Sequence, residues 1–445
     1  MKFNPFRPGS IVTPGMFAGR GKELSTLEAI LFQTKRRNPQ HFLLSGERGI
    51  GKSSLLYYLQ LVASGVISTV DGTKFNFLTL SLELEPDDGF EAIANKVGTE
   101  LRSVVSAHKS VKTLAQTGWD FLKRWEVLGV KYTAEITQTA RHQLMDELCL
   151  AVVNTLGRLK ETVDGCVILI DEADKPEISA NLGAFSKLLT ERLTKRDAHN
   201  VALGLAGVTG IIGKLRASHE SAPRIFHAVN LEPLKPEDRL SVIQKGLEEA
   251  KTQNETNVEI TKEAADLISS LSEGYPNFVQ QFAFCAFDFD TDNNIDREDV
   301  VNGAYNKDGA FQQLGQKYFS ELYFDQIGSD EYREVLRAMA ERSDGWVTKN
   351  EIKSVVNLKP ATLNNAITSL KRKNIIIPKP GKQGIYRLPN KSFAVWIKSF
   401  TITSPSEQNT VEEKGKTAVS FPSTTATVTK PPSTDKMLSE NGGQP

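Results

Sequence analysis

A glycine-rich stretch that ends in lysine and serine is the part of this sequence whose residue types and spacing most directly indicate chemistry. Residues 46–53 read Gly-Glu-Arg-Gly-Ile-Gly-Lys-Ser, which fits the pattern GxxxxGK[ST]. In such a loop, successive backbone N–H groups wrap phosphate groups, the lysine neutralises the terminal phosphate oxygens and the hydroxyl ligates Mg²⁺. The pattern predicts a site for ATP and Mg²⁺ formed by Gly46, Glu47, Arg48, Gly49, Ile50, Gly51, Lys52, Ser53 and Ser54.

Two adjacent carboxylates, Asp171 and Glu172, follow the apolar run Val167–Ile170. By itself such a pair fits a strand that runs into a solvated acidic turn, but together with the glycine-rich loop it predicts a hydrolytic metal site. We expect Asp171 and Ser53 to hold Mg²⁺ and Glu172 to polarise the attacking water, because neighbouring strand residues point to opposite sides. With Lys52 on the phosphates, the predicted reaction is hydrolysis of ATP to ADP and phosphate.

The elements that position these residues are predicted by apolar runs that alternate with helical patterns over residues 1–232. The expected strands are His41–Ser45, Phe77–Leu82, Val167–Ile170, Val201–Ala206 and a short Ala228–Leu231. This alternation predicts an α/β fold with a parallel sheet, in which the carboxyl ends of the strands carry the site. Residues 84–150 are too long for a simple crossover, so we expect a helical insertion there, with a small hairpin near residues 129–132.

Three further segments follow the predicted α/β core. Helical patterns over residues 233–328 predict an all-helical lid. Residues 329–400 read as three short helices and two β-rich pieces, the outline of a winged helix-turn-helix domain. Residues 401–445 are rich in Ser, Thr and Pro and poor in aromatic residues, which predicts a disordered tail.

The order of these motifs resembles the AAA+/STAND group of P-loop ATPases, particularly its archaeal-type and origin-recognition-like branch. The resemblance rests on Phe17-Ala18-Gly19-Arg20 with Glu23-Leu24, the loop 46–53, Asp171-Glu172-Ala173-Asp174, the strand Val201–Ala206, Arg224-Ile225-Phe226, Gly274-Tyr275-Pro276 and the C-terminal winged helix. It implies a P-loop NTPase core in which Phe17 lines the adenine pocket and Pro276 approaches the nucleotide from the lid. An ordinary helix N-terminus would explain Gly274-Tyr275-Pro276 equally well.

The same resemblance suggests two further catalytic candidates, Thr209 and Arg224. Thr209 is the one plausible polar sensor after the fourth strand, and Arg224 either completes the site of a neighbouring copy in a homo-oligomer or forms a surface salt bridge. The helix after Gly274 lacks the arginine common in AAA+ lids. The chain thus departs from the AAA+ pattern twice: Thr209 is a substitute for the usual polar sensor, and the lid arginine is missing. Both departures favour a switch with slow hydrolysis over a fast motor.

The acidic loop Asp288–Asp299 superficially follows the spacing of an EF-hand calcium loop. Asn293 replaces the glycine of the sharp turn, and Asp299 replaces the bidentate glutamate. A loop between helices, with Ile295 packed inward and Asp296 capping a helix over residues 297–305, explains the same residues without calcium. We favour the capping interpretation.

Positive charge is concentrated in residues 329–400, which contain 14 Lys or Arg and 6 Asp or Glu, although the whole chain has a net charge of +0. Within the predicted recognition helix, residues 360–373, an apolar face leaves polar side chains on the other faces. These and the wing supply the candidate DNA contacts Thr362, Asn364, Asn365, Lys371, Arg372, Lys379 and Lys382. Double-stranded DNA is the expected partner; the alternative is a signalling or scaffold ATPase whose winged helix and tail bind an effector protein without DNA.

The bulk composition agrees with a cytoplasmic protein. The chain has no apolar stretch of membrane-spanning length and no signal peptide, so we expect no membrane partner. Its three cysteines lie far apart and form neither a zinc-binding spacing nor a disulfide framework.

Overall fold

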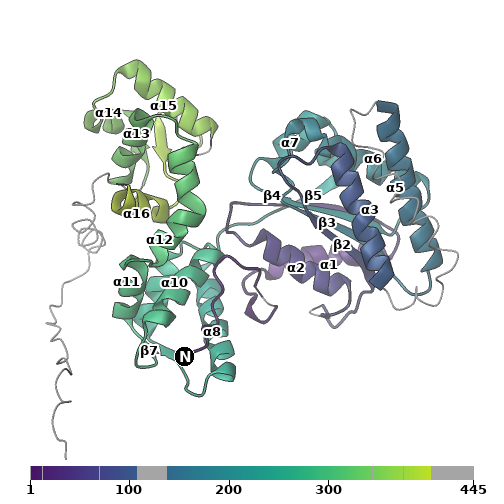
Figure 1. Ribbon diagram of the computed structural model, residues 1–445, viewed down its shortest axis with the longest axis horizontal. Coiled ribbons are helices and arrows are strands. Elements are labelled where there is room, and N and C mark those ends of the chain that lie inside the picture. The colour runs from purple at the N-terminus through teal and green to yellow at the C-terminus, as the bar shows by residue number, and fades with distance from the viewer. Residues whose placement is uncertain are drawn as a thin grey trace, which may run out of the picture.

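The computed structural model describes residues 2–12, 14–69, 71–107, 138–342, 345–373 and 375–401, and shows two lobes side by side (Figure 1). One lobe is an α/β core. The other contains helices of residues 233–328, here called the lid, and residues 329–400, here called the C-terminal module. The hairpin predicted near residues 129–132 and the predicted disordered tail, apart from Thr401, lie outside the described residues.

A five-stranded parallel sheet forms the centre of the core, in the order β2-β3-β4-β1-β5. Its strands are β1 (His41–Ser45), β2 (Phe77–Glu83), β3 (Gly165–Asp171), β4 (Val201–Gly207) and β5 (Phe226–Asn230). The predicted parallel sheet is therefore confirmed. The bounds of β5 differ from the prediction: pairing with β1 begins at Phe226, and the exposed His227 and Ala228 of this edge strand break its apolar pattern.

Helices cover both faces of the sheet, as apolar strands buried on both sides require. On one face, α1 (Gly21–Lys35) and α2 (Lys52–Ala63) pack against Phe42, Leu44 and Leu169. On the other, α3 (Phe90–Ala107), α5 (Gln138–Arg158), α6 (Leu182–Lys195) and α7 (Ile211–Ser218) pack against Leu43 and Ile168. The described part of residues 84–150 thus contributes two helices to a layer of the core.

The lid contains α8 (Pro236–Gln253), α9 (Lys262–Leu271), α10 (Pro276–Phe289), α11 (Arg297–Tyr305) and α12 (Ala310–Leu314). The prediction of an all-helical lid is wrong in one detail, because β6 (Glu259–Ile260) and β7 (Asn294–Ile295) form a small parallel pair. The pair arises because the buried Ile295 brings the two connecting loops together. After α12 the chain continues through two π-helical segments, η5 (Gly315–Phe319) and η6 (Glu321–Asp325).

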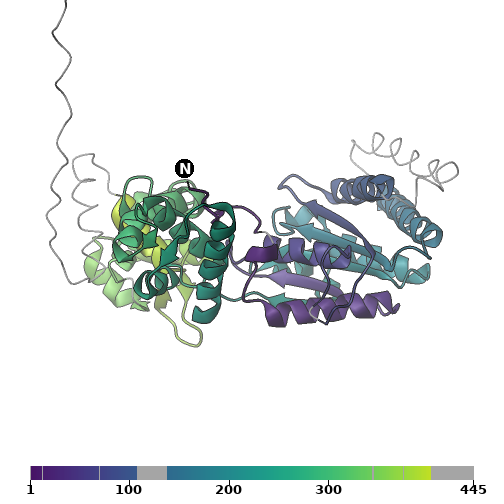
Figure 2. The same ribbon diagram turned by 90° about the horizontal axis from the view of Figure 1, so that it is seen from below.

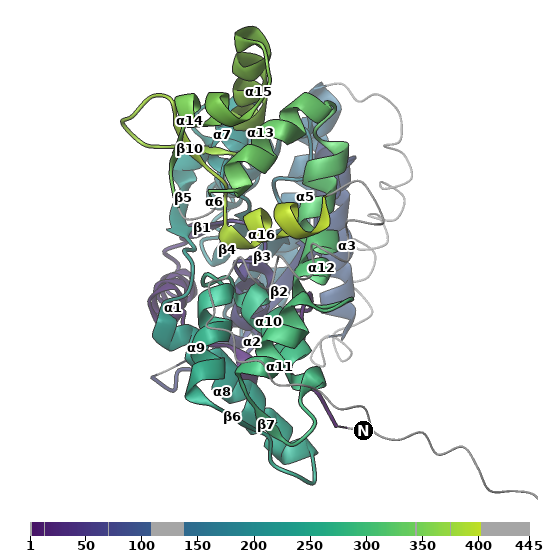
Figure 3. The same ribbon diagram turned by 90° about the vertical axis from the view of Figure 1, so that its left-hand side faces the viewer.

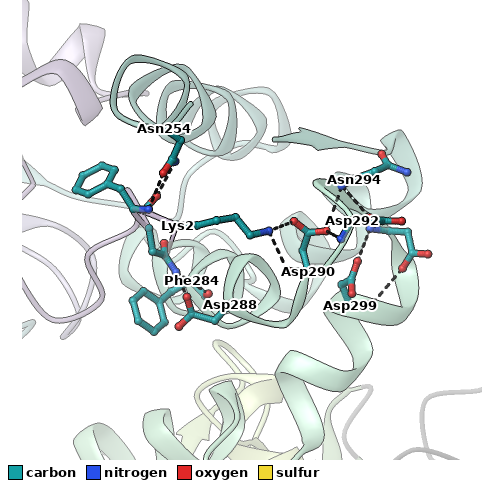
Figure 4. A network of polar contacts seen from close by, with 11 residues as sticks. Lys2, Asn254, Phe284, Asp288, Asp290, Asp292, Asn294 and Asp299 are labelled. Carbon is teal, nitrogen blue, oxygen red and sulfur yellow. Dashed lines mark hydrogen bonds and ion pairs between the residues drawn. The ribbon is translucent and has the colours of Figure 1, made fainter. Parts of the chain in front are cut away.

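The acidic loop of the lid is organised by hydrogen bonds among its own residues and by Lys2 (Figure 4). The Asp296 carboxylate accepts hydrogen bonds from the N–H groups of Glu298 and Asp299 at the start of α11, and the Asp299 carboxylate accepts the N–H of Asp296. The Asp290 carboxylate lies 2.5 Å from Lys2 Nζ. The capping interpretation of this loop is therefore confirmed.

The C-terminal module contains α13 (Asp330–Ala340), α14 (Lys349–Val355), α15 (Pro360–Arg372) and α16 (Lys391–Phe400). Its strands β8 (Val347–Thr348), β9 (Ile377–Pro378) and β10 (Ile385–Arg387) form an antiparallel sheet in the order β8-β10-β9. In Figure 3, α16 lies between α12 of the lid and the rest of the module. Rings of Phe319, Tyr323, Phe393 and Trp396 pack together there, so the lid and the module share one hydrophobic core.

Candidate nucleotide-binding site

The glycine-rich loop connects the end of β1 at Ser45 to the start of α2 at Lys52, as the motif predicts. Gly49 and Gly51 have φ angles of 77° and 96°, in the left-handed region where glycine is favoured. A Cβ at Gly46 would lie 2.9 Å from Ile50 Cγ2 and 3.0 Å from the Leu231 carbonyl oxygen. The fold of this loop therefore depends on its glycines, and its N–H groups lie at the N-terminus of α2, where an anion is favoured.

The Lys52 side chain is buried within this loop. Its Nζ donates hydrogen bonds to the carbonyl oxygens of Gly46, at 3.1 Å, and Glu47, at 3.0 Å. Burial lowers the pKa of Lys52, and the neighbouring Glu172 opposes that shift. The site therefore combines a desolvated cation with the backbone donors of a helix N-terminus.

The two predicted carboxylates lie where β3 ends and the chain turns away. Asp171 Oδ1 accepts a hydrogen bond of 2.8 Å from the N–H of Glu172. Glu172 has a φ angle of 51°, so it belongs to a left-handed turn and not to the strand. The expectation that strand alternation orients Glu172 is therefore wrong. The turn decides its direction, and Glu172 lines the cavity described next.

A cavity of about 480 Å³ lies against the glycine-rich loop, between the core, the lid and the N-terminal residues 2–12, here called the N-terminal strap. The predicted site residues on its lining are Arg48, Gly49, Ile50, Gly51, Lys52, Ser53, Ser54, Phe17, Glu172 and Pro276. Gly46 and Glu47 lie in the same loop and bind Lys52 through their carbonyl groups. The structure therefore brings the motif, one carboxylate and the lid proline to one cavity.

Burial raises the pKa of the Glu172 carboxyl, and Asp171 beside it adds to that shift. A carboxylate whose pKa is raised accepts a proton more readily at neutral pH, which suits a general base. Within the described residues, no group of three or more His, Cys, Asp or Glu side chains could hold a metal ion by itself. Ser53 and Asp171 would fit Mg²⁺ even so, because Mg²⁺ usually takes one or two carboxylates together with phosphates and water.

Thr209 and Arg224 lie apart from the described lining of the cavity. β4 ends at Gly207, and the cavity is lined by Val208, whereas Thr209 is exposed one residue further along. Arg224 is exposed in the short helix η4 (Ala222–Ile225) that precedes β5. The structure tests neither predicted role.

The N-terminal strap supplies cavity residues that the sequence analysis missed. Arg7, Ser10, Ile11 and Val12 line the cavity, as do Asn277, Gln280, Lys317 and Tyr318 of the lid. The strap runs from the lid toward the core (Figure 2) and is held on the lid by the buried Phe6 and by hydrogen bonds from its backbone to Asn254 and Gln280. No periodic pattern marks this segment, and the one available signal was the presence of two phenylalanines among polar residues.

The lid contacts the glycine-rich loop directly through Tyr275, Pro276 and Asn277. The Tyr275 hydroxyl donates a hydrogen bond to the Glu47 carboxylate, and the Asn277 N–H donates to the Gly49 carbonyl at 3.4 Å. Pro276 is the first residue of α10, so it opens a helix as well as lining the cavity. The two interpretations of Gly274-Tyr275-Pro276 are therefore compatible.

Buried Arg20 links the loop to the exit of β5. Its guanidinium donates to the Ile50 carbonyl at 2.9 Å and to the Glu232 carbonyl at 2.7 Å. Burial lowers its pKa, and Glu23, 3.4 Å away, opposes that shift. Arg20 therefore holds the loop backbone from behind.

Residues 16–203 match the family model of the AAA ATPase domain. The matched segment contains the loop 46–53, the Asp171-Glu172 pair, the strands β1, β2 and β3, and the start of β4. The family that this segment matches consists of ATPase domains, and such a domain implies nucleotide binding. Among curated proteins, no sequence matches the chain. No described helix of the protein is both long and apolar enough to cross a bilayer.

Solved structures resemble the chain well beyond the AAA ATPase domain. The Walker-type ATPase PABY2304 of Pyrococcus abyssi is 16% identical, with 86% of this chain and 96% of that chain covered, at a TM-score of 0.50. The Aeropyrum pernix ORC2 protein is 12% identical, with 93% and 98% covered, at a TM-score of 0.49. The Aeropyrum pernix ORC1 protein in complex with DNA is 16% identical, with 87% and 94% covered, at 0.42. The likeness to the Pyrococcus ATPase, at a TM-score of 0.50, indicates a shared fold.

Proposed function

We propose that this protein is a molecular switch that binds and slowly hydrolyses ATP and couples its nucleotide state to DNA binding by the C-terminal module. The observation that carries the proposal is the cavity, because the glycine-rich loop and the lid both line it. A nucleotide bound there contacts both lobes, so its phosphates influence how the lobes are arranged. The match of residues 16–203 to the AAA ATPase domain supports ATP as the ligand.

The proposed roles follow the chemistry of the residues at the cavity. Lys52 and the N–H groups of the loop bind the phosphates, and Ser53 and Asp171 hold Mg²⁺, which when bound neutralises charge on the phosphates. Glu172 accepts a proton from the attacking water, in accord with its raised pKa. After β4 the cavity is lined by the apolar Val208 and not by Thr209, so the described residues place no polar sensor there, which supports slow turnover.

Self-association is proposed from Arg224. Its guanidinium is exposed in η4, and no carboxylate lies within ion-pair distance of it among the described residues. An exposed arginine at this place is free to approach the phosphates bound by a second copy. Mass measurement with and without ATP, on the parent and on Arg224→Ala, tests this part of the proposal; equal masses throughout would exclude it.

DNA binding is proposed from the form and charge of the C-terminal module. Its elements follow the order helix, strand, helix, helix, strand, strand, which supports a winged helix-turn-helix with α15 as the recognition helix. Leu363, Ile367 and Leu370 are buried as expected, and most of the candidate contacts on α15 are exposed. In the proposed wing, Lys379 Nζ and the Arg387 guanidinium carbon each lie 5.3 Å from the centroid of the Trp346 ring.

The ATPase part of the proposal is tested with Lys52→Ala and Glu172→Gln. We expect Lys52→Ala to lose nucleotide binding, because the buried cation is removed from the phosphates. Glu172→Gln should bind ATP at nearly the parent affinity and lose turnover by roughly 100-fold or more, the usual contribution of a general base. The exposed Glu177→Gln is the matched control. Parent-like hydrolysis by Glu172→Gln would remove Glu172 from the mechanism.

The DNA part is tested by binding of the full chain to duplex DNA in rising salt, with and without ATP. Lys379→Ala with Lys382→Ala should weaken binding and reduce the salt slope by about one to two phosphate contacts. Lys251→Ala with Lys262→Ala removes the same charge from exposed positions of the lid and should leave binding unchanged. Absence of affinity at low salt would reject DNA and favour a scaffold ATPase that recruits proteins.

A further inference from the structure

Five consecutive residues where the chain passes from α9 into α10, Glu273–Asn277, contact the glycine-rich loop, the C-terminal module and the core-to-lid connection. We call this segment the lid turn. Helix α9 ends at Leu271, and α10 begins at Pro276, so the lid turn includes the first two residues of α10. Tyr275 makes the side-chain contact with the loop and Glu273 makes the contact with α16, so these two contacts can be removed separately.

On the side of the nucleotide site, the lid turn meets the loop at three points. The Tyr275 hydroxyl donates to the Glu47 carboxylate, and the Asn277 N–H donates to the Gly49 carbonyl at 3.4 Å. A Cβ placed on Gly51 would lie 3.7 Å from Pro276 Cγ. Any shift of the loop backbone on phosphate binding therefore changes contacts with the lid turn.

Asn277 also joins the two other segments that line the cavity. Its Oδ1 accepts the N–H of Gly9, in the N-terminal strap, at 2.8 Å, and its Nδ2 donates to the Tyr318 hydroxyl in η5. The lid turn therefore contacts the cavity lining on the loop, on the strap and on the helix that leads to the C-terminal module.

On the side of the C-terminal module, Glu273 binds the N-terminus of α16. Its Oε1 accepts the N–H of Ser392 at 2.9 Å and the Ser392 hydroxyl at 3.5 Å. The Ser392 hydroxyl also donates to the Leu271 carbonyl at 3.3 Å. Since α16 packs against α12 and α13, the position of its first turn depends on a carboxylate only two residues from Tyr275.

The backbone of the lid turn has little freedom to absorb a displacement. Glu273 and Gly274 have φ angles of 51° and 87°, two successive left-handed residues. A Cβ at Gly274 would lie 2.6 Å from the Leu234 carbonyl oxygen, and the Leu234 N–H donates to the Gly274 carbonyl at 2.7 Å. A turn held in this way moves as a unit, because neighbouring backbone conformations are blocked.

We propose that the lid turn transmits nucleotide occupancy to the C-terminal module, with Tyr275 as the residue that responds to the loop and Glu273 as the residue that positions α16. The inference rests on the proposed binding of ATP in the cavity. A triphosphate in the loop places several negative charges near the Glu47 carboxylate, which repels it and changes the Tyr275–Glu47 hydrogen bond. The two nucleotide states then differ in a contact made by the lid turn, which is the condition for a ligand to shift a conformation.

The experiment measures two quantities on the full chain: affinity for a non-hydrolysable ATP analogue with Mg²⁺, and amide hydrogen exchange of residues 389–400 with and without that analogue. In the parent protein the analogue should change exchange in the first turn of α16 by roughly 5- to 150-fold, the usual range of coupling between sites. Tyr275→Phe keeps the ring that stacks on Phe278 and loses only the hydroxyl. It and Glu273→Ala, which removes the acceptor of the Ser392 N–H, should bind the analogue and lose the exchange response.

Matched controls separate coupling from general loss of structure. Tyr305→Phe removes from the same lid a buried hydroxyl that has no hydrogen-bond partner among the described residues, and Glu248→Ala removes an exposed lid carboxylate. Both should respond as the parent does. In a double variant, Tyr275→Phe with Glu47→Ala should behave as the more affected single variant, since each change removes the same hydrogen bond.

The outcomes distinguish this inference from the proposed function. If the parent protein does not bind the analogue, the proposed function fails first. If the parent binds it and α16 shows no exchange response, or if Tyr275→Phe and Glu273→Ala respond fully, ATP binding stands and the role of the lid turn is wrong.

Discussion

The acid sensitivity of the α/β core should depend on His41, the first residue of β1. Its Nδ1 accepts the N–H of Leu203 in β4 at 3.1 Å, which requires the neutral ring. Burial lowers the pKa of His41 to about 4 from its usual 6.5. Between these two values the unfolded chain binds a proton that the folded chain does not, so the core loses stability as pH falls from 6.5 toward 4.

The magnitude follows from the two pKa values. A difference of about 2.5 pKa units at 1.36 kcal/mol per unit corresponds to about 3.4 kcal/mol below pH 4, of which about 2 kcal/mol is already lost at pH 5. In His41→Asn the side-chain oxygen can accept the Leu203 N–H in place of Nδ1, and the amide does not titrate. The variant should therefore lack this part of the acid destabilisation.

Hydrogen exchange of peptides from β1 and β4 measures the effect where it occurs, without assuming that the whole chain unfolds in one step. Between pH 7 and pH 5, after correction for intrinsic exchange rates, the opening free energy of these strands should fall by about 2 kcal/mol more in the parent than in His41→Asn. Parallel curves for the two proteins would show that His41 binds its proton equally well in the folded core and in the unfolded chain, and would refute the reasoning.

Two further predictions concern packing around the site. Gly315→Ala should lower the stability of the lid and the C-terminal module by about 1–3 kcal/mol, because a Cβ there would overlap the indole nitrogen of Trp396. Thermal unfolding measures this effect, with Gly213→Ala as the control, because a Cβ at Gly213 meets nothing within 4 Å. Equal melting temperatures for the two variants would contradict the prediction. Arg20→Met should weaken ATP binding by about 5- to 150-fold, because the Ile50 carbonyl loses a buried donor worth about 1–3 kcal/mol. Direct titration with ATP measures this, and parent-like affinity would show that the loop does not need the guanidinium.

The sequence by itself determined the parts of the site that are contiguous. The loop 46–53 is a local pattern whose glycines, lysine and hydroxyl act together within one strand–loop–helix unit. Its residue types therefore predicted its position between a strand and a helix. The apolar strands were equally predictable, because burial on both faces leaves a nearly continuous apolar run. The inward-facing Ile295 and the cap formed by Asp296 also follow from local rules.

Only the tertiary structure decided which distant residues complete the cavity and which way the carboxylates point. Arg7, Lys317 and Tyr318 reach the cavity because the N-terminal strap and η5 pack on α10, and no periodicity of theirs records that packing. Glu172 faces the cavity because the chain enters a left-handed turn where β3 ends, a backbone choice made by the surrounding contacts. Glu273 binds α16 across more than 100 residues of sequence. Such contacts depend on how whole helices and strands pack together, whereas the local structure of a motif depends on residues that are adjacent in the sequence.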